Sequence, residues 1–278
     1  MLALSKIVYN AGTITGPIIS TALEGKMKML LKGAFLLHGC LSLSVVGVAL
    51  AEDKAAESYT YGTYFVCDVT QQDRADEIFK ALYQPLHDAA VTDGSLAGYG
   101  LYAHQTGGKW RRLMYAQAPS IQALMDAEKK IHDQAEAQNN KKLNTEFGKI
   151  CNSHEDYIWR TIAGNQGTSA PGNAVFSTYF VCNSHETQAD AIVKQVFAPL
   201  YDKLVTEGKL KTWGYLEHIV GGHIRRVATM SAADMNSLMA TRAEINKVMK
   251  DNVLGDMFTE ICDSHEDYMW DVKASRLH

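Results

Sequence analysis

Two copies of one short polar motif are the residues of this sequence best suited to chemistry. Each copy reads Ser-His-Glu-Asp-Tyr, and in each the histidine stands two residues before the aspartate: His154 and Asp156, then His265 and Asp267. Because side chains alternate along a strand, both members of a pair are expected on one face. Such a pair could bind a metal ion or hold a proton near neutral pH. The alternative is structural, with the serine and aspartate turning the chain and the histidine satisfying backbone groups.

A second candidate site joins a histidine to two arginines across a Gly-Gly turn, and it also occurs twice. Its members are His104, Arg111 and Arg112 in the first copy and His218, Arg225 and Arg226 in the second. Arginine offers a fork of donors that fits a carboxylate, so these residues could hold an anionic ligand. They could equally form an exposed hairpin tip with solvated charges. The histidines could also ligate haem, although no Cys-x-x-Cys-His attachment motif exists, so the cofactor stays open.

Composition narrows the class of protein. The chain has 278 residues, of which 46% are hydrophobic and 21% charged, and the net charge is −4. These fractions are typical of globular proteins, and the length allows two domains. A dedicated nucleic-acid partner is not expected, because such binding needs a surplus of lysine and arginine on one face. The sequence contains no glycine-rich phosphate loop, nucleophile elbow or metalloprotease helix, and no cysteine spacing that predicts a metal site.

The first fifty-one residues have the order of a secretory signal peptide. A short basic start at residues 27–32 precedes an almost uncharged stretch at residues 33–50, and Ala-Leu-Ala ends at Ala51. Basic segment, apolar segment and small-x-small site are the three parts of such a signal. We therefore predict an N-terminal extension and signal peptide over residues 1–51, cleavage after Ala51, and a periplasmic or secreted protein.

Other interpretations of this segment remain open. Translation could start at Met27 or Met29 instead of Met1. An uncleaved membrane anchor is an alternative, because the apolar run is nearly long enough to span a bilayer. A lipoprotein signal ending at Cys40 is another, although the apolar run continues beyond that cysteine. After signal cleavage no stable membrane insertion is predicted.

Self-similarity defines the organisation of the remaining chain. Residues 63–67 read Thr-Tyr-Phe-Val-Cys and return at residues 178–182, and further matches follow in the same order. A repeat of this length and order indicates duplication of one structural unit. The resulting division is a first repeat over residues 60–162, a linker rich in Gly, Ser, Thr and Asn over residues 163–174, and a second repeat over residues 175–272.

Each copy contains the pattern of four strands and two helices. In the first copy the expected strands are residues 64–67, 98–104, 109–116 and 157–159, and the expected helices are residues 73–90, interrupted at Pro85, and 120–131, capped by Ser120. A glycine pair makes the turn between the middle strands. The order β-α-β-β-α-β predicts a ferredoxin-like α+β unit, in which the strands lie in the order 4-1-3-2.

The four cysteines that follow the predicted signal fit this topology. They are Cys67, Cys151, Cys182 and Cys262. The end of strand one lies beside the start of strand four, so pairing within each copy is expected, and an even count in an exported chain favours disulfides. Free buried thiols are the alternative.

One antiparallel sheet with both helices on one side leaves its other face bare, and a second unit on the same chain can cover it. In the order of its elements and in their duplication, the sequence resembles the dimeric α/β-barrel superfamily, over about residues 60–160 and 175–271. The resemblance implies two units packed sheet to sheet, with pockets between sheet and helices. It also implies a range of activities, which includes cofactor-free monooxygenases, lactone isomerases and haem-binding or haem-using enzymes.

Fold alone does not choose among these activities. The leading interpretation is an exported protein that binds a small molecule, with the ligand unspecified. The first alternative is a cofactor-independent monooxygenase- or isomerase-like enzyme. The second is a structural or interaction module without a small-molecule site. An oligomer is compatible with each of them.

Overall fold

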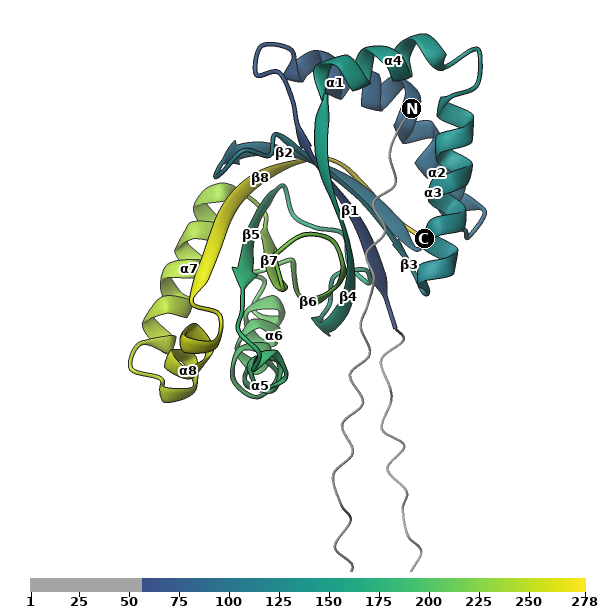
Figure 1. Cartoon of the computed structure of the whole chain (residues 1–278). Coiled ribbons are helices and arrows are strands. Elements are labelled where there is room, and N and C mark those ends of the chain that lie inside the picture. The colour runs from purple at the N-terminus through teal and green to yellow at the C-terminus, as the bar shows by residue number, and fades with distance from the viewer. Residues whose placement is uncertain (1–56) are drawn as a thin grey trace, which may run out of the picture. The chain divides into compact units, whose positions relative to one another are not determined.

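A computed structural model describes residues 57–278 of the chain (Figure 1). The predicted signal peptide and its alternatives, including the cleavage after Ala51 and the lipoprotein site at Cys40, lie outside the described residues. Within residues 57–278, two halves with the same order of elements follow each other along the chain.

The first half spans residues 59–164. Its strands and helices are, in chain order, β1 (Tyr59–Val66), α1 (Gln72–Ile78), a π-helical segment η1 (Phe79–Tyr83), α2 (Gln84–Thr92), β2 (Gly98–Thr106), β3 (Arg112–Ala118), α3 (Ile121–Ala135), α4 (Lys141–Ile150) and β4 (Ser153–Gly164). The last strand is longer than the sequence pattern indicated, because it starts within the polar motif itself. The polar stretch before it forms a separate helix, α4.

The second half spans residues 174–277 and repeats this order. Its elements are β5 (Ala174–Val181), α5 (Glu186–Ile192), a π-helical segment η2 (Val193–Phe197), α6 (Ala198–Thr206), β6 (Thr212–Val220), β7 (Arg226–Ala232), α7 (Met235–Met249), α8 (Val253–Ile261) and β8 (Ser264–Leu277). Both halves therefore have the predicted β-α-β-β-α-β order, with one additional helix before the last strand.

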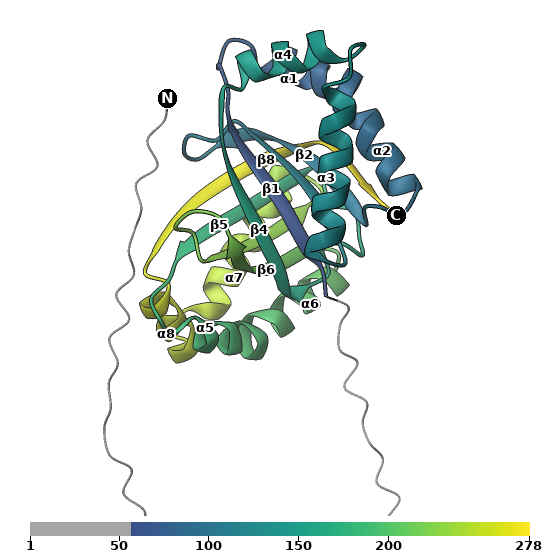
Figure 2. The same ribbon diagram turned by 45° about the vertical axis from the view of Figure 1, so that its right-hand side comes forward.

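The eight strands close into one antiparallel barrel. The strand order around it is β1-β3-β2-β8-β5-β7-β6-β4, so each half contributes four neighbours in the predicted order 4-1-3-2. The halves also join at both edges, because β2 pairs with β8 and β4 pairs with β6. Edge pairing removes the exposed strand edges of two separate sheets. Figure 2 shows the helices outside this barrel, those of each half beside their own strands.

Alternation along the strands separates the barrel interior from the helix-facing surface. On β1, Tyr64 faces inward and joins a cluster of aromatic and aliphatic side chains from both halves. Its neighbour Phe65 faces outward and packs under the helices of the first half. On β5, Tyr179 and Phe180 divide in the same way. The predicted packing of the two sheets face to face is thus confirmed, and aromatic rings provide most of the contact.

Local signals explain where the helices begin and break. The hydroxyl of Ser120 accepts a hydrogen bond from the backbone N–H of Ala123 at 3.1 Å, which caps α3 as expected. Pro85 lies in the first turn of α2, directly after η1. Proline lacks the N–H that an uninterrupted α-helix requires, and a π-helical turn shifts the hydrogen-bond pattern at that point. The second half repeats this arrangement at Pro199.

Two disulfides join the strands that the topology predicted to be neighbours. Cys67 at the end of β1 is bonded to Cys151 just before β4, and Cys182 is bonded to Cys262 in the second half. The bonds span 84 and 80 residues of sequence. Closing loops of this length is worth up to ~4 kcal/mol of unfolding free energy on the chain-entropy model.

Candidate functional site

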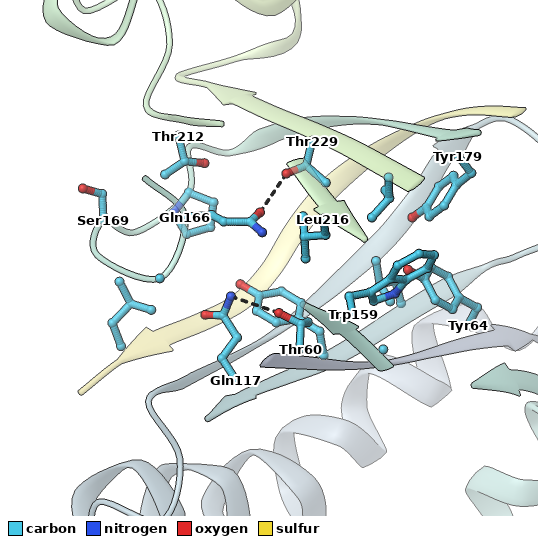
Figure 3. Close-up of a pocket in the computed structure, with 17 residues that line it drawn as sticks. Thr60, Tyr64, Gln117, Trp159, Gln166, Ser169, Tyr179, Thr212, Leu216 and Thr229 are labelled. Carbon is cyan, nitrogen blue, oxygen red and sulfur yellow. Dashed lines mark hydrogen bonds between the residues drawn. The ribbon is translucent and has the colours of Figure 1, made fainter. Parts of the chain in front are cut away.

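The barrel interior holds a small cavity at the end covered by residues 166–171 (Figure 3). Its volume is about 70 Å³. The Gln166 side chain accepts a hydrogen bond from Thr229, and Gln117 donates one to Thr60, so polar groups at this end already have partners. Pockets for small organic ligands usually enclose ~300–1,000 Å³. The interior cavity is therefore too small to be the site of such a ligand.

A larger pocket lies outside the barrel, between the sheet and helices of the first half. Its volume is about 610 Å³. Side chains from β1, η1, α3, α4 and β4 line it, and the aromatic wall consists of Tyr61, Phe65, Tyr83 and Phe147. We refer to it as the outer pocket.

The His154–Asp156 pair of the polar motif lies in the outer pocket. Nδ1 of His154 is 3.0 Å from Oδ2 of Asp156, so the alternation of β4 brings the two side chains together as predicted. The other carboxylate oxygen, Oδ1 of Asp156, is buried and has no hydrogen-bond partner within the chain. A buried acceptor without a donor costs free energy, and such atoms in folded proteins often mark the position of a ligand or water. The equivalent pair in the second half, His265 and Asp267, is looser, at 3.8 Å.

Glu128 of α3 faces this pair across the pocket. Burial, together with the negative charge of Asp156, raises the pKa of Glu128 to about 7. Burial also raises the pKa of Tyr61 to about 12, and the charges of Asp156 and Glu128, together with the approach of the Tyr61 hydroxyl to the Asp156 carboxylate, add to that effect. A carboxyl group that titrates near neutral pH can give or take a proton under physiological conditions. The outer pocket thus combines a proton-exchanging acid, an unpartnered acceptor and an aromatic wall.

Sequence patterns placed Glu128 on an amphipathic helix but gave no reason to single it out. A signal did exist in the comparison of the two copies. Glu128 is the eighth residue after the cap Ser120, and the eighth residue after the equivalent cap Asp234 is Arg242. The charge also reverses at exposed positions of the same helices, such as Asp133 and Lys247, so the comparison singles out Glu128 only once the structure shows that this residue lines a pocket.

The histidine–arginine cluster is also assembled as the hairpin pattern predicted. Nη1 of Arg111 lies 2.9 Å from Nδ1 of His104, and Arg225 approaches His218 at the same distance. Burial and the neighbouring arginine charge lower the pKa of both histidines. A neutral imidazole can accept a hydrogen bond from the guanidinium. These interactions pair Nδ1 of each histidine with its own arginine, whereas Nε2 of His218 is buried without a hydrogen-bond partner.

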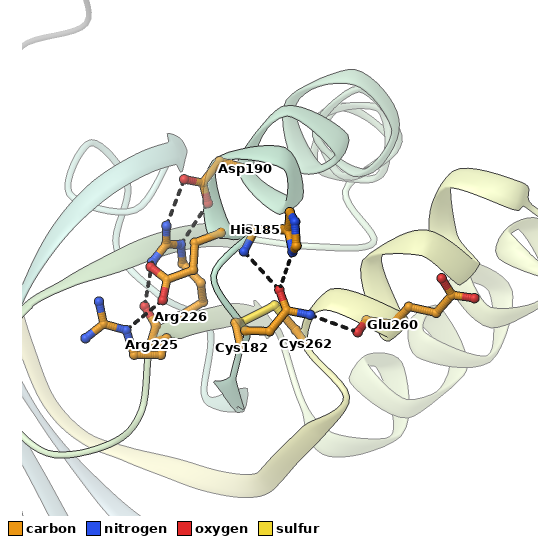
Figure 4. Close-up of a disulfide and its surroundings, with 9 residues drawn as sticks. Cys182, His185, Asp190, Arg225, Arg226, Glu260 and Cys262 are labelled. Carbon is orange, nitrogen blue, oxygen red and sulfur yellow. Dashed lines mark hydrogen bonds and ion pairs between the residues drawn. A yellow bond between two sulfur atoms is a disulfide. The ribbon is translucent and has the colours of Figure 1, made fainter. Parts of the chain in front are cut away.

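The second arginine of each cluster is buried and fully engaged. The Arg112 side chain is 4% exposed and binds both carboxylate oxygens of Asp76, at 2.5 and 3.0 Å, besides two oxygens of Gln72. Figure 4 shows the equivalent pair in the second half, where Arg226 binds Asp190 near the Cys182–Cys262 disulfide. The hollow beside His104, of about 270 Å³, is lined by the aspartates Asp73, Asp76 and Asp271. Arg112 and Lys273 line it as well, but Arg112 is paired with Asp76 and the aspartates outnumber the cations, so the hollow is less suited to an anion than the sequence pattern alone indicated.

The Gly-Gly turns of these hairpins contact the polar motif of the opposite half. A Cβ atom at Gly107 would lie 2.6 Å from the carbonyl oxygen of Asp267 and 2.8 Å from the ring of Tyr268. Gly107 also has a φ of 134°, which side-chain-bearing residues rarely adopt. Gly221 packs against Tyr157 in the same way. The repeated glycines and tyrosines therefore add to the strand pairing and the interior cluster that join the two halves.

Comparison with solved structures places this architecture among known folds. A candidate monooxygenase from Lactobacillus acidophilus NCFM superposes with a TM-score of 0.52 at 7% identity, covering 79% of this chain and 96% of that one. A candidate monooxygenase from Fusobacterium nucleatum subsp. nucleatum superposes with a TM-score of 0.54 at 8% identity, covering 81% and 95%. The chain has the dimeric α/β-barrel fold. At these identities the likeness concerns the fold alone.

No family model matches the sequence, and no curated protein sequence matches it. Within residues 57–278, no group of three or more His, Cys, Asp or Glu side chains is arranged to hold a metal ion. In the same range, every helix is too short or too polar to cross a membrane.

Proposed function

We propose that this protein is an exported small-molecule-binding protein whose ligand occupies the outer pocket of the first half. One observation carries the proposal: Oδ1 of Asp156 is a buried acceptor without a partner, and its side chain lines the pocket. A ligand that donates a hydrogen bond to this oxygen would remove the cost of leaving it unpaired, which is ~1–3 kcal/mol. The pocket volume of about 610 Å³ lies within the range of small-ligand sites.

Export is supported by the two disulfides. Structural disulfides form and persist in oxidising compartments such as the periplasm or the extracellular space. Both bonds lie within the described residues and join strands of the barrel. The proposal combines them with the signal-like order of residues 27–51.

Catalysis by acid–base chemistry is the second candidate function, and Glu128 favours it. Its pKa of about 7 lets the carboxyl exchange a proton at neutral pH, beside the His154–Asp156 pair. Proton abstraction from a bound substrate is the kind of step that a cofactor-independent isomerase or monooxygenase requires. In this reading Glu128 is the base and Asp156 orients the substrate.

Haem is a ligand to be included in the test. Histidine ligands of metals commonly donate their other ring nitrogen to a carboxylate, and His154 has such a carboxylate in Asp156. His154 would hold the iron through Nε2, and bound haem would supply redox chemistry. The ligand panel below therefore includes hemin.

The proposal is tested by filling the pocket from a position that tolerates a side chain. Gly148 of α4 lines the outer pocket, and a Cβ atom there has open space around it. The variant Gly148→Leu places a side chain into the pocket without disturbing the core. Leucine is also the better helix former, by ~0.8 kcal/mol, so the variant is expected to fold. Thr259→Leu, at the matching position of α8, is the control.

Binding of a fragment library and of hemin would be measured by saturation-transfer NMR and by absorption spectroscopy. We expect ligands that bind the wild type and Thr259→Leu to lose binding in Gly148→Leu. If no compound binds, or if bound compounds are unaffected by Gly148→Leu, the proposal is wrong. The structural-module interpretation would then be preferred.

A further inference from the structure

The second half of the barrel has an arginine at the position where the first half has the outer pocket. The guanidinium carbon of Arg242 lies 3.2 Å from the centroid of the Phe176 ring, in a cation–π arrangement. Burial lowers the pKa of Arg242, and the negative charge of Asp267 opposes that effect, so the aspartate helps to stabilise the half-buried cation. A positive group thus rests on an aromatic ring beside the aspartate of the polar motif.

Strand register shows which residues of the first half are equivalent. In the second half Phe176 pairs with Met269 and Thr178 pairs with Asp267, whereas in the first half Tyr61 pairs with Ile158 and Thr63 pairs with Asp156. The pairs match: Tyr61 takes the place of Phe176, and Asp156 takes the place of Asp267. Helix numbering from the caps places Glu128 opposite Arg242.

The first half therefore keeps the ring and the aspartate but lacks the cation. Glu128 adds a second carboxyl group where the second half has a guanidinium, and Oδ1 of Asp156 has no donor. We infer that the outer pocket binds an organic cation, a primary amine or guanidinium attached to a flat or apolar group, whose charge lies on Tyr61 between Asp156 and Glu128. This inference deepens the proposed function and rests on it.

The charges around the pocket agree with this ligand class. Lys129, the lysine in the lining, is paired with Asp133 at 2.5 Å and is exposed. Glu136 accepts a hydrogen bond from Asn144 at the rim. Among the described residues, the carboxyl groups that line the pocket are those of Glu128, Glu136 and Asp156. A cation between these groups would gain charge-assisted hydrogen bonds, which are stronger than neutral ones.

The aromatic wall of the pocket determines which uncharged group the ligand should carry beside its cation. Phe65 and Phe147 are in contact at a ring-centroid distance of 5.3 Å, and Tyr83 packs on Phe147 at 5.1 Å. These rings line the same pocket as the carboxyl groups. An apolar or aromatic substituent on the cation would cover them and leave water. Small hydrophilic cations such as ammonium lack this contact.

Three probes of similar size separate charge from shape: 2-phenylethylamine, 2-phenylethanol and phenylacetate. Their dissociation constants for the full exported chain would be measured by isothermal titration calorimetry at low ionic strength. We expect the amine to bind at least about tenfold more tightly than the alcohol, which corresponds to one charge-assisted hydrogen bond, and phenylacetate to bind more weakly than both. Equal affinities of amine and alcohol would overturn the inference.

Variants locate the binding. Asp156→Asn is expected to reduce amine affinity about tenfold or more, whereas Asp126→Asn, which removes a charge from the exposed surface of α3, leaves it nearly unchanged. Arg242→Ala frees the equivalent position of the second half, so the stoichiometry is expected to rise from one amine to two. A single site in Arg242→Ala would contradict the equivalence of the two positions.

The remaining outcomes separate this inference from the proposed function. If hemin or neutral fragments bind in a way that Gly148→Leu blocks, while the amine does not bind, the cation inference is wrong and the proposed pocket stands. If Gly148→Leu has no effect on any ligand, both fail.

Discussion

Replacing Glu128 with glutamine should make the protein more stable, by an amount that grows as the pH rises from about 4.5 to 7 and is complete above neutral pH. In the folded chain burial and Asp156 raise the pKa of Glu128 to about 7, from an ordinary value of 4.5. Between these pH values the unfolded chain releases the proton and the folded chain keeps it. Ionisation therefore favours unfolding, by an amount that is absent below the unfolded pKa, grows through this window and is complete above about pH 7.

The size of the effect follows from the two pKa values. Each pKa unit corresponds to ~1.4 kcal/mol, which gives at most ~3 kcal/mol for Glu128. The side chain is partly exposed, and solvent screening lowers the value, so ~1–3 kcal/mol is expected. Glu128→Gln cannot ionise and avoids this cost. Its unfolding free energy should be close to that of the wild type at pH 4 and ~1–3 kcal/mol higher at pH 8.5.

The assay is urea denaturation followed by tryptophan fluorescence, without reductant, at intervals from pH 4 to pH 9. Arg242→Gln, the matching change in α7, is the control, because arginine keeps its charge throughout this range and its removal should shift stability by a constant amount. A constant difference between wild type and Glu128→Gln across the whole range would refute the reasoning. It would show that the glutamate titrates as it does in the unfolded chain.

Two further predictions concern the frame that holds the pocket. The double variant Cys67→Ala, Cys151→Ala is expected to lose ~2–4 kcal/mol of unfolding free energy, measured by urea denaturation. An unchanged midpoint would mean that the bond does not constrain the unfolded chain. Gly107→Ala is expected to lower the melting temperature more than Gly94→Ala, because both glycines have positive φ but only Gly107 packs against the opposite half. Equal losses would contradict the role assigned to the Gly-Gly turns.

Much of the fold follows from local patterns in the sequence. Alternation and 3.6-residue periodicity identified the strands and the amphipathic helices, and their order implied the strand arrangement of each half. Because that arrangement places the end of strand one beside the start of strand four, it also gave the pairing of Cys67 with Cys151. Closure of the barrel was harder to predict from the sequence, because the pairing of β2 with β8 and of β4 with β6 uses backbone hydrogen bonds that have no side-chain signature.

The residues of the candidate site also fall into two groups, those that the sequence could predict and those that it could not. The His154–Asp156 pair could be predicted, because side chains two residues apart on a strand lie on the same face of the sheet. This depends only on the local chain. Glu128 could not, because its pKa depends on burial against β1 and β4, which are distant in sequence. The arginines of the hairpins were identified as neighbours of the histidines, but the pairing of Arg112 with Asp76 of α1 emerged only from tertiary packing.

The sequence by itself determined that this protein has two similar α+β halves. Each half has a pair of cysteines at equivalent positions and one polar motif beside the second of them. Only the tertiary structure decided that one half has an open acidic pocket and the other a half-buried arginine on an aromatic ring. The physical reason is that residue order fixes which side chains share a local face, whereas desolvation and charge depend on which elements pack against that face.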